Sequence, residues 1–326
     1  MLVRGVRIGL CGTDHEINEG YYGSAPPGSD ALVLGHESLG RVVRGGADLP
    51  DGTLVVGIVR RPDGCPNCAR GQQDMCLWGD FTERGIGGLH GFGSEWWVER
   101  PEYVVAIPER LADGGVLLEP LTVVEKVVRH AFRIQGRAHW EPKRALVAGA
   151  GPIGILGAVL LRLGGLAVTV FERTEKPERR ELLARIGAGY AATEATPLDE
   201  IVAGAGPVDM AIEATGNAGV AFTLMQHLGT NGVLGLTSVS GGDATAEVPV
   251  ARVNRGLVLG NKVVFGSVNA NRADFEQGVR DLGEAERRWP GFLATLITAR
   301  VPLADAAPAV THDPRQIKVV VELGGA

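Results

Sequence analysis

The chain has 326 residues, of which 45% are hydrophobic and 21% charged, a length and balance typical of a soluble globular protein with two domains. Its net charge of −6 disfavours nucleic-acid binding, which requires a basic surface. The sequence has no apolar run of the roughly 18 residues that cross a bilayer, and its start lacks a secretory-signal pattern. We therefore predict a cytoplasmic protein with neither a membrane nor a nucleic-acid partner.

The first third of the chain is predicted to be an irregular, barrel-like β domain. Short apolar runs alternate there with turns that contain Gly or Pro. We predict strands at Val3–Leu10, Arg41–Val43, Leu54–Arg60, Glu95–Glu99 and Val104–Ile107. The apolar spacing then changes to that of a helix, over Leu117–Arg133.

From Arg144 the sequence has the alternation of a doubly wound parallel sheet. A strand at Arg144–Ala148, a Gly-rich turn, a helix at Ile155–Leu163 and a strand at Ala167–Phe171 make one βαβ unit. Further elements are predicted as strands at Val208–Ile212, Gly232–Leu236 and Lys262–Gly266 and a helix at Ala218–His227. In the tail we predict a helix at Asp274–Leu282 and a closing strand, Ile317–Leu323, that returns to the first domain.

The turn after the first strand of this block has the spacing of a dinucleotide-binding loop. Gly149 allows the tight turn, Gly151 lets the backbone approach a pyrophosphate, and Gly154 lets helix and strand pack closely. The helix start offers free N–H groups to a phosphate, so we assign Pro152 and Ile153 to the same site. This motif, between two strands, predicts a nicotinamide cofactor, NAD(P)+.

Residues at the end of the second strand give conflicting signals about the cofactor. Glu172 would accept hydrogen bonds from both ribose hydroxyls of NAD and repel a 2′-phosphate. Arg173 follows it, with Lys176 nearby, and a guanidinium binds phosphate well. The prediction leans to NAD and leaves NADP use open. We interpret Arg179 and Arg180 as the solvated start of a helix.

Three of the four cysteines, Cys65, Cys68 and Cys76, lie within twelve residues. This clustering indicates a metal site more than a disulfide in a cytosolic protein. The fourth, Cys11, lies far from them in sequence. Taken singly, Cys11, His36 and Glu37 each have an ordinary structural explanation, as a buried thiol, a core histidine and a surface charge.

Several longer segments change that interpretation. They are Cys-Gly-Thr-Asp-His-Glu-Ile, which begins at Cys11, Leu-Val-Leu-Gly-His-Glu-Ser-Leu-Gly, which contains His36, Gly-Leu-His-Gly-Phe with Glu-Trp-Trp, and Leu-Leu-Glu-Pro-Leu-Thr-Val-Val-Glu-Lys. Over essentially its whole length the chain resembles the zinc-dependent medium-chain dehydrogenases, and among them the archaeal-type glucose dehydrogenase branch. The resemblance implies an α/β protein with two domains. These are a GroES-like irregular β-barrel catalytic domain (residues 1–125 and 271–326) and a Rossmann doubly wound parallel-sheet domain (residues 126–270).

The resemblance implies one catalytic Zn²⁺ held by Cys11, His36, Glu37 and Glu119. Either Glu37 or Glu119 would bind directly or through water, and mixed sulfur, nitrogen and oxygen ligands suit zinc. Release of Glu37 with entry of water would provide the exchangeable position that a catalytic site needs. Asp14 is expected to hydrogen-bond the far nitrogen of His36.

The family also has a structural zinc lobe with four cysteines, which corresponds to Cys65, Cys68 and Cys76 here. The first of the four falls at Pro62, which cannot bind metal. Asp63 or water could take its place, and a metal-free loop with reduced thiols is the alternative.

The implied reaction is oxidation of the anomeric hydroxyl of an aldose to a lactone, with zinc as Lewis acid and hydride transfer to NAD(P)+. Thr13 is implied as the first proton carrier, and His15 or Glu16 would pass the proton outward. Glu83 would bind sugar hydroxyls, and Asn269 would lie where substrate and nicotinamide meet.

Further details follow from the same resemblance. Thr215 is assigned to the cofactor site, and Val123 stands where relatives place an acidic residue, so the preferred sugar epimer is open. Met1 falls inside the first strand, where relatives have an additional hairpin, so we expect an uncovered edge in the first domain. A homo-tetramer or homo-dimer is expected.

Two alternative functions belong beside this one. The first is a polyol or secondary-alcohol dehydrogenase on the same fold. The second is a non-catalytic NAD(P)-binding protein, whose signature would be the loss of zinc ligands.

Overall fold

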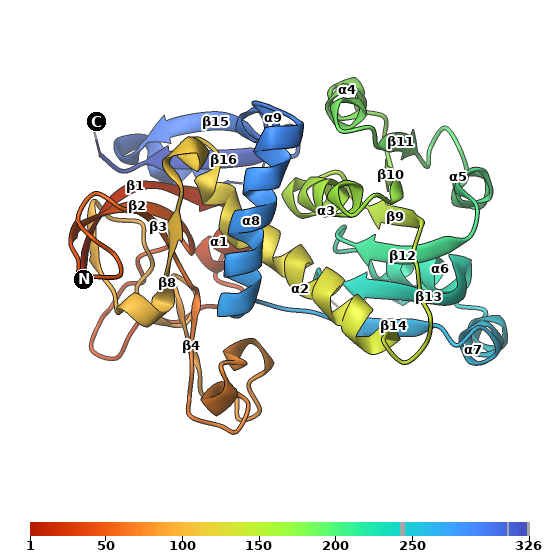
Figure 1. The fold of residues 1–326 in the computed structure, drawn as a ribbon, viewed down its shortest axis with the longest axis horizontal. Helices are drawn as coiled ribbons and strands as arrows, with labels where there is room; N and C mark the ends of the chain where they lie inside the picture. Colours follow the sequence, from red (N-terminus) through yellow and green to blue (C-terminus); the bar gives the residue numbers. More distant parts are fainter. Residues whose placement is uncertain (242–244, 312, 325–326) are drawn as a thin grey trace. The chain divides into compact units, whose positions relative to one another are not determined.

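The computed structural model describes residues 1–241, 245–311 and 313–324, which form two compact units (Figure 1). The first unit contains Met1–Thr122 and Asn269–Ala326, and the second contains Val123–Val268. Helix α2 (Leu118–Gln135) includes the boundary after Thr122. Among the described residues, no helix combines the length and apolar character that crossing a membrane requires.

A seven-stranded sheet is the frame of the first unit. Its strand order is β15-β16-β1-β2-β3-β8, and β7 pairs with β1 beside that path. The strands are β1 (Leu2–Leu10), β2 (Glu37–Arg44), β3 (Leu54–Gly57), β7 (Trp96–Val98), β8 (Val104–Ile107), β15 (Ile297–Pro302) and β16 (Lys318–Glu322). The closing strand predicted from the tail is β16, and it lies antiparallel to β1.

Both edges of β1 are paired. Strand β2 covers one edge, whereas β7 covers Leu2–Arg4 and β16 covers Arg7–Leu10 on the other. The uncovered edge that we expected in this domain therefore does not fall on the first strand, because β7 and β16 share the edge opposite β2.

One predicted strand, Leu54–Arg60, is divided between two sheets. After β3 the chain leaves the large sheet and forms β4 (Arg60–Arg61), which joins β5 (Thr82–Arg84) and β6 (Gly88–Leu89) in a three-stranded sheet. Every residue from 54 to 60 is buried. Such a run lacks the alternation that would reveal where one strand ends, so the prediction of a single strand was wrong.

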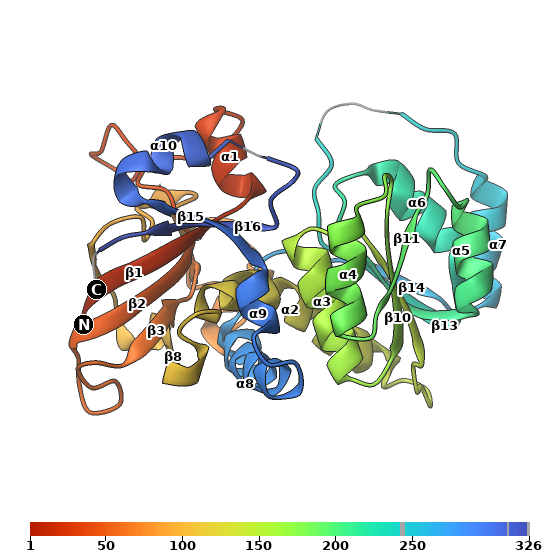
Figure 2. The ribbon, with the colours of Figure 1, turned by 90° about the horizontal axis from the view of Figure 1, so that it is seen from above.

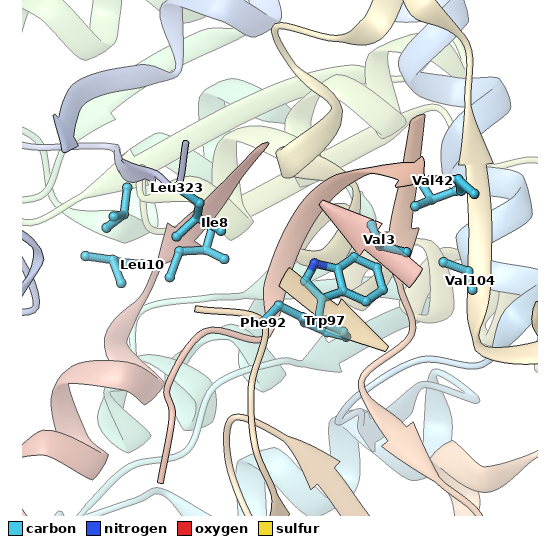
Figure 3. Close-up of a cluster of buried hydrophobic side chains, with 10 residues drawn as sticks. Val3, Ile8, Leu10, Val42, Phe92, Trp97, Val104 and Leu323 are labelled. Atoms are coloured by element: carbon cyan, nitrogen blue, oxygen red, sulfur yellow. The ribbon is translucent and has the colours of Figure 1, made fainter. Parts of the chain in front are cut away.

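The core of the first unit gathers apolar side chains from strands that are distant in sequence (Figure 3). Its buried members are Val3, Ile8, Leu10, Val42, Val55, Phe92, Trp97, Val104, Val321 and Leu323. The rings of Phe92 and Trp97 meet edge to face, with centroids 4.8 Å apart and an angle of 61° between planes. Burial of each large apolar side chain contributes ~1.5–3 kcal/mol, which explains why these strands hold one another in place.

The remaining helices of the first unit are short, apart from one. They are α1 (Gly12–Asn18), α8 (Arg272–Arg288), α9 (Phe292–Thr295), α10 (Ala306–Ala309) and 3₁₀ turns at Cys68–Arg70, Gln73–Met75, Pro101–Tyr103, Glu109–Leu111, Gly115–Leu117 and Leu303–Asp305. Helix α8 extends beyond the predicted Asp274–Leu282 at both ends, and Asn271 and Asp274 form a capping box that fixes its start.

A six-stranded parallel sheet in the order β11-β10-β9-β12-β13-β14 forms the second unit. Its strands are β9 (Arg144–Ala148), β10 (Ala167–Glu172), β11 (Gly189–Ala192), β12 (Val208–Glu213), β13 (Leu228–Leu236) and β14 (Val263–Gly266). Its helices are α3 (Pro152–Leu163), α4 (Pro177–Arg185), α5 (Leu198–Ala205), α6 (Ala218–His227) and α7 (Val250–Leu259).

The helices cover both faces of this sheet. Figure 2 shows α3 and α4 on one face and α5, α6 and α7 on the other. The strand order reverses between β9 and β12, and the carboxyl ends of the strands at such a switch point are where doubly wound folds bind dinucleotides. The α/β class with a doubly wound sheet, predicted from the sequence, is confirmed.

Candidate active site and metal centres

Cys11 and His36 lie side by side at the end of the first strand. Cys11 follows β1 as the N-cap of α1, and its Sγ accepts a hydrogen bond from the Thr13 N–H at 3.3 Å. His36 immediately precedes β2, whose first residue, Glu37, pairs with Gly9 of β1. This antiparallel register brings Cys11 Sγ within 3.2 Å of His36 Nε2.

Asp14 lies behind His36 and faces its other nitrogen. The Oδ1 atom is 3.4 Å from His36 Nδ1, and the carboxylate also accepts hydrogen bonds from the N–H groups of Cys11 (3.1 Å) and Gly35 (3.2 Å). Burial alone would raise the pKa of Asp14, but His36 and these N–H donors outweigh it and lower the pKa. An ionised Asp14 thus sets the ring orientation of His36, at the position where we expected it.

The neighbours of His36 favour its protonated form. Burial would lower its pKa, but the negative charges of Cys11 and Asp14 and the hydrogen bonds to both raise the pKa well above its usual value. A metal binds neutral imidazole, so a metal at this position would compete with a proton for His36.

Glu37 forms a buried ion pair with Lys318, a residue that sequence reasoning missed. Lys318 Nζ donates to both carboxylate oxygens, at 2.6 and 2.7 Å, and to the Leu10 carbonyl at 3.1 Å. Both side chains are almost fully buried. Burial would lower the pKa of Lys318, but the charges of Glu37, Cys11 and Glu119 raise it. A lysine directly before the apolar run Val319–Val321 of the closing strand was the available signal.

Gly9 makes room for this ion pair. A Cβ at Gly9 would collide with the Glu37 carboxylate, which lies directly across the strand pair. The glycine is therefore required by close packing and by no special backbone conformation.

Glu119 enters the same cluster from the first turn of α2. It is 9% exposed, and burial, together with the neighbouring charge of Glu37, raises its pKa to about 7, although His36 and Lys318 oppose this shift. Ligand atoms of His36, Glu37 and Glu119 all lie within 4.8 Å of one another, and those of Cys11, Asp14 and His36 form a second group of the same size.

The four predicted ligands thus converge on His36. A thiolate, an imidazole and two carboxylates at these separations form the mixed donor set that suits Zn²⁺. The residues present fit a catalytic zinc. Because Lys318 binds both oxygens of Glu37, Glu119 is the carboxylate that is less engaged by protein cations.

The predicted proton carriers surround a tyrosine that sequence reasoning also missed. The Tyr22 hydroxyl lies close enough to Thr13 and Glu16 for both to influence its pKa: burial and the charge of Glu16 raise the pKa, and Thr13 lowers it in part. Glu16 is exposed, whereas Thr13 and His15 are half-buried on α1. A tyrosine in the loop after α1 carries no motif, so folding of that loop over the helix was needed to reveal it.

Glu83 and Asn269, both predicted to bind substrate, contact each other. Glu83 Oε1 accepts hydrogen bonds from Asn269 Nδ2 at 2.6 Å and from Arg60 Nε at 3.0 Å. Asn269 adopts a left-handed backbone conformation (φ 59°), which asparagine tolerates better than most residues. Arg60, buried over the ring of Phe81, was not foreseen as a partner.

The cysteine lobe forms a second candidate metal centre. Ligand atoms of Asp63, Cys65, Cys68 and Cys76 all lie within 4.8 Å of one another, and the four cysteines of the chain are free thiols. Asp63 Oδ2 accepts a hydrogen bond from Cys76 Sγ at 2.7 Å, which is the main reason that the pKa of Asp63 is lowered. The structure therefore brings to the three thiols the aspartate that we considered as a substitute ligand.

Backbone N–H groups support a thiolate within the lobe. Cys65 Sγ accepts from the N–H groups of Cys68 and Leu77, each at 3.4 Å. Burial raises the pKa of Cys65, but these N–H donors outweigh it and lower the pKa, whereas burial raises the pKa of Cys68 to about 12. The arrangement suits a cation, which would replace the thiol protons.

The predicted dinucleotide loop has the required geometry in the second unit. Gly149 has a φ of +98°, and a Cβ there would lie 2.7 Å from the Ala214 carbonyl oxygen. A Cβ at Gly151, the N-cap of α3, would have no neighbour within 4 Å, which leaves space for a phosphate. Gly154 packs against the Gly149 carbonyl, and Pro152 begins the helix. These residues fit NAD(P)+, and Ile153 is half-buried beside them.

Thr215 lies in the turn after β12 and is held by a buried carboxylate. Its N–H and hydroxyl donate to Glu213 Oε1 at 2.6 and 2.5 Å, and the Ser238 hydroxyl donates to Oε2 of the same residue. Glu213 was not singled out from the sequence. It fixes the turn next to Gly149 and so shapes the dinucleotide loop.

Among the charged residues after β10, Arg179 differs from the prediction. Glu172 is bound by Lys176 and Tyr190, whereas Arg173 is exposed with Glu194 3.5 Å away. Arg179 was expected at a solvated helix start but is 2% exposed, so that interpretation was wrong. The helix turns this side of its first turn toward the sheet, which residue type alone does not indicate.

We predict that Lys318→Met destabilises the metal-free protein by ~3–5 kcal/mol, because the Glu37 carboxylate would remain buried without its counter-charge. Urea unfolding at neutral pH measures this change. Lys143→Met, at an exposed lysine, should change the free energy of unfolding by less than about 0.5 kcal/mol. The double variant Lys318→Met/Glu37→Gln should recover most of the lost stability. Equal stability of Lys318→Met and Lys143→Met would contradict the role of the pair.

We predict that Glu119 makes the stability of the metal-free protein depend on pH. Because folding raises the pKa of Glu119 from 4.5 to about 7, its protonated form stabilises the fold at low pH, and this contribution is lost as pH rises through 7. Between pH 5 and 8, metal-free wild type should therefore lose more stability than Glu119→Gln, by up to ~3 kcal/mol. Urea unfolding with a chelator present measures the difference. Parallel curves of unfolding free energy against pH for wild type and Glu119→Gln would refute this prediction. Glu102→Gln, at an exposed glutamate, serves as the control.

Comparison with known proteins agrees with both halves of the structure. The chain matches the family "Alcohol dehydrogenase GroES-like domain" over residues 1–109 and the family "Glucose dehydrogenase C-terminus" over residues 112–323. Glucose 1-dehydrogenase of Methanocella arvoryzae is 44% identical, over 99% of this chain and 92% of that protein. That of Thermoproteus tenax is 39% identical over 99% and 91%.

A solved structure extends the likeness to three dimensions. Haloferax mediterranei glucose dehydrogenase in complex with NADP, Zn and gluconolactone is 34% identical and superposes with a TM-score of 0.91, over 100% of this chain and 92% of that one. The chain therefore belongs to the zinc-dependent medium-chain dehydrogenases, within their glucose dehydrogenase branch.

Proposed function

We propose that the protein is an NAD(P)-dependent glucose 1-dehydrogenase, which oxidises the anomeric C1 hydroxyl of D-glucose or a related aldose to the lactone. The observation that carries this proposal is the convergence of Cys11, His36, Glu37 and Glu119 in a chain whose curated relatives have the name glucose 1-dehydrogenase. The presence of all four predicted ligands disfavours a non-catalytic NAD(P)-binding protein.

Zinc at this cluster would supply Lewis-acid polarisation of the anomeric hydroxyl. We assign Cys11 and His36 as ligands, with Glu119 as the direct carboxylate ligand, because Lys318 holds both oxygens of Glu37. Asp14 keeps His36 in the orientation and tautomer that present Nε2 to the metal.

The sugar proton would leave through Thr13. Because Thr13 and Glu16 both influence the pKa of Tyr22, we propose that its hydroxyl joins the carrier at the metal to the exposed carboxylate of Glu16. His15, the other carrier suggested by the sequence, is half-buried on the same helix.

Sugar hydroxyls would bind to Glu83 and Asn269. Arg60 and Asn269 both donate to Oε1 of Glu83, so Oε2 is the oxygen that we assign to the substrate. Asn269 then contributes by fixing Glu83 as well as by contact with substrate.

Initial rates test this function. Aldoses should reduce NAD+ or NADP+ rapidly, a chelator should lower the rate at least a hundredfold, and added Zn²⁺ should restore it. His36→Ala should have the same effect as the chelator, whereas His139→Ala, at a side chain that is 87% exposed, should retain activity. Rapid reduction of NAD+ or NADP+ with sorbitol or a simple secondary alcohol, but none with aldoses, would contradict the proposal. It would favour the polyol or secondary-alcohol dehydrogenase alternative.

We also propose a structural Zn²⁺ in the lobe, held by Asp63, Cys65, Cys68 and Cys76. Their mutual distances and the bond between Cys76 and Asp63 support this ligand set. Metal analysis should find two zinc ions per chain in the wild type, and Asp63→Ala should lower the content toward one after mild chelation. Asp80→Ala, at an exposed neighbour, should retain two. One zinc per chain in the wild type would exclude the lobe site.

Assembly, location and domain roles are further proposals. A homo-dimer or homo-tetramer is supported by β14 at the edge of its sheet and by exposed Val250, Val258 and Leu259 on α7. Free cysteines in a metal-type cluster support a cytoplasmic location. We assign the first unit to catalysis and the second to nucleotide binding.

A further inference from the structure

Two donors from its own unit hold the carboxylate of Glu172 at the end of β10. The Tyr190 hydroxyl, from the neighbouring strand β11, donates to Oε1 at 2.6 Å, and Lys176 Nζ donates to Oε2 at 2.7 Å. The same hydroxyl accepts a hydrogen bond from the Lys176 N–H at 3.0 Å. Glu172 therefore does not face the ribose site as an isolated negative charge.

The other cations after β10 are placed differently. Arg173 is 84% exposed and faces Glu194, and Arg180 is bound by both oxygens of Glu175 at 2.9 and 2.8 Å. Arg179 is 2% exposed. Lys176, whose side chain is 32% exposed, is thus the one of these four cations that both contacts Glu172 and retains access to solvent.

This placement changes what the acidic residue can do. A carboxylate at this position accepts bonds from ribose hydroxyls and repels a 2′-phosphate. Each carboxylate oxygen has two acceptor positions, so Glu172 keeps capacity for ribose hydroxyls beside its two protein donors. An ammonium has three N–H donors, so Lys176 has donors for a phosphate while it offsets the charge of Glu172.

We propose that Lys176 is a cofactor-specificity residue, which lets the site bind a 2′-phosphorylated cofactor despite Glu172 and so accept both NAD+ and NADP+. The inference rests on the proposed function only in taking NAD(P)+ as the cofactor. Tyr190 acts as a positioning residue, since burial and its bond to Glu172 raise its pKa and keep its hydroxyl a donor.

Binding of two small probes tests the inference without catalysis. Titration calorimetry of the full chain with 2′,5′-ADP and with 5′-AMP isolates the 2′-phosphate, because these ligands differ in that group alone. Lys176→Met should raise the Kd for 2′,5′-ADP about tenfold, the effect of one charge-assisted contact, and change the Kd for 5′-AMP less than about twofold. Retained 5′-AMP binding also shows that the variant is folded.

Three further variants sharpen the test. Glu172→Gln should tighten 2′,5′-ADP binding, because it removes the repelling charge and leaves Lys176 in place. Arg173→Met and Arg180→Met, matched losses of a neighbouring cation, should leave the ratio of the two Kd values unchanged. The inference is overturned if Lys176→Met weakens the binding of both probes equally or of neither. It is also overturned if Arg173→Met, and not Lys176→Met, abolishes the difference between the two Kd values.

The two proposals fail separately. Probe binding that responds to Lys176 in a protein that oxidises no aldose would refute the proposed sugar oxidation and retain the specificity role. Aldose oxidation with an unchanged ratio of NADP+ to NAD+ kcat/KM in Lys176→Met would refute the specificity role alone.

Discussion

The buried pair of Lys318 and Glu37 is the interaction on which the metal cluster depends. It joins the closing strand β16 to the start of β2 across β1, and it fills the space that Gly9 leaves. A buried ion pair stabilises little relative to an apolar pair, but either partner alone would be strongly destabilising. The pair therefore ties the correct placement of Glu37 to the return of the tail, so the cluster forms only when both ends of the first unit are folded together.

Around this pair the buried charges are balanced in a way that couples metal binding to protons. Lys318 and His36 oppose the charges of Glu37, Asp14 and Cys11, while Glu119 has its pKa near 7 because it is buried beside them. A divalent cation would displace the proton of His36 and favour ionised Glu119. Such an exchange would leave the net buried charge of the cluster little changed.

The cysteine lobe is linked to the residues proposed for the substrate. Arg60 binds Glu83 and reaches the Gln73 carbonyl of the lobe, and buried Asp74 accepts a hydrogen bond from Asn271, two residues after Asn269. The lobe is therefore bonded both to Arg60, the partner of Glu83, and to Asn271, which lies near Asn269 in the chain. These hydrogen bonds couple order in the lobe to the positions of the Glu83 and Asn269 side chains.

The sequence by itself predicts the features that depend on residues close together in the chain. The spacing of Gly149, Gly151 and Gly154 predicts the dinucleotide loop, because each glycine is sterically required within one turn. The motifs at Cys11 and His36 identify the family. Only the tertiary structure determines the features that depend on distant segments. These are the division of Leu54–Arg60 between two sheets, the burial of Arg179, and the roles of Lys318, Tyr190 and Tyr22 as partners of the predicted site residues. No local period encodes such contacts, because strand register and helix rotation are set by packing across the whole unit.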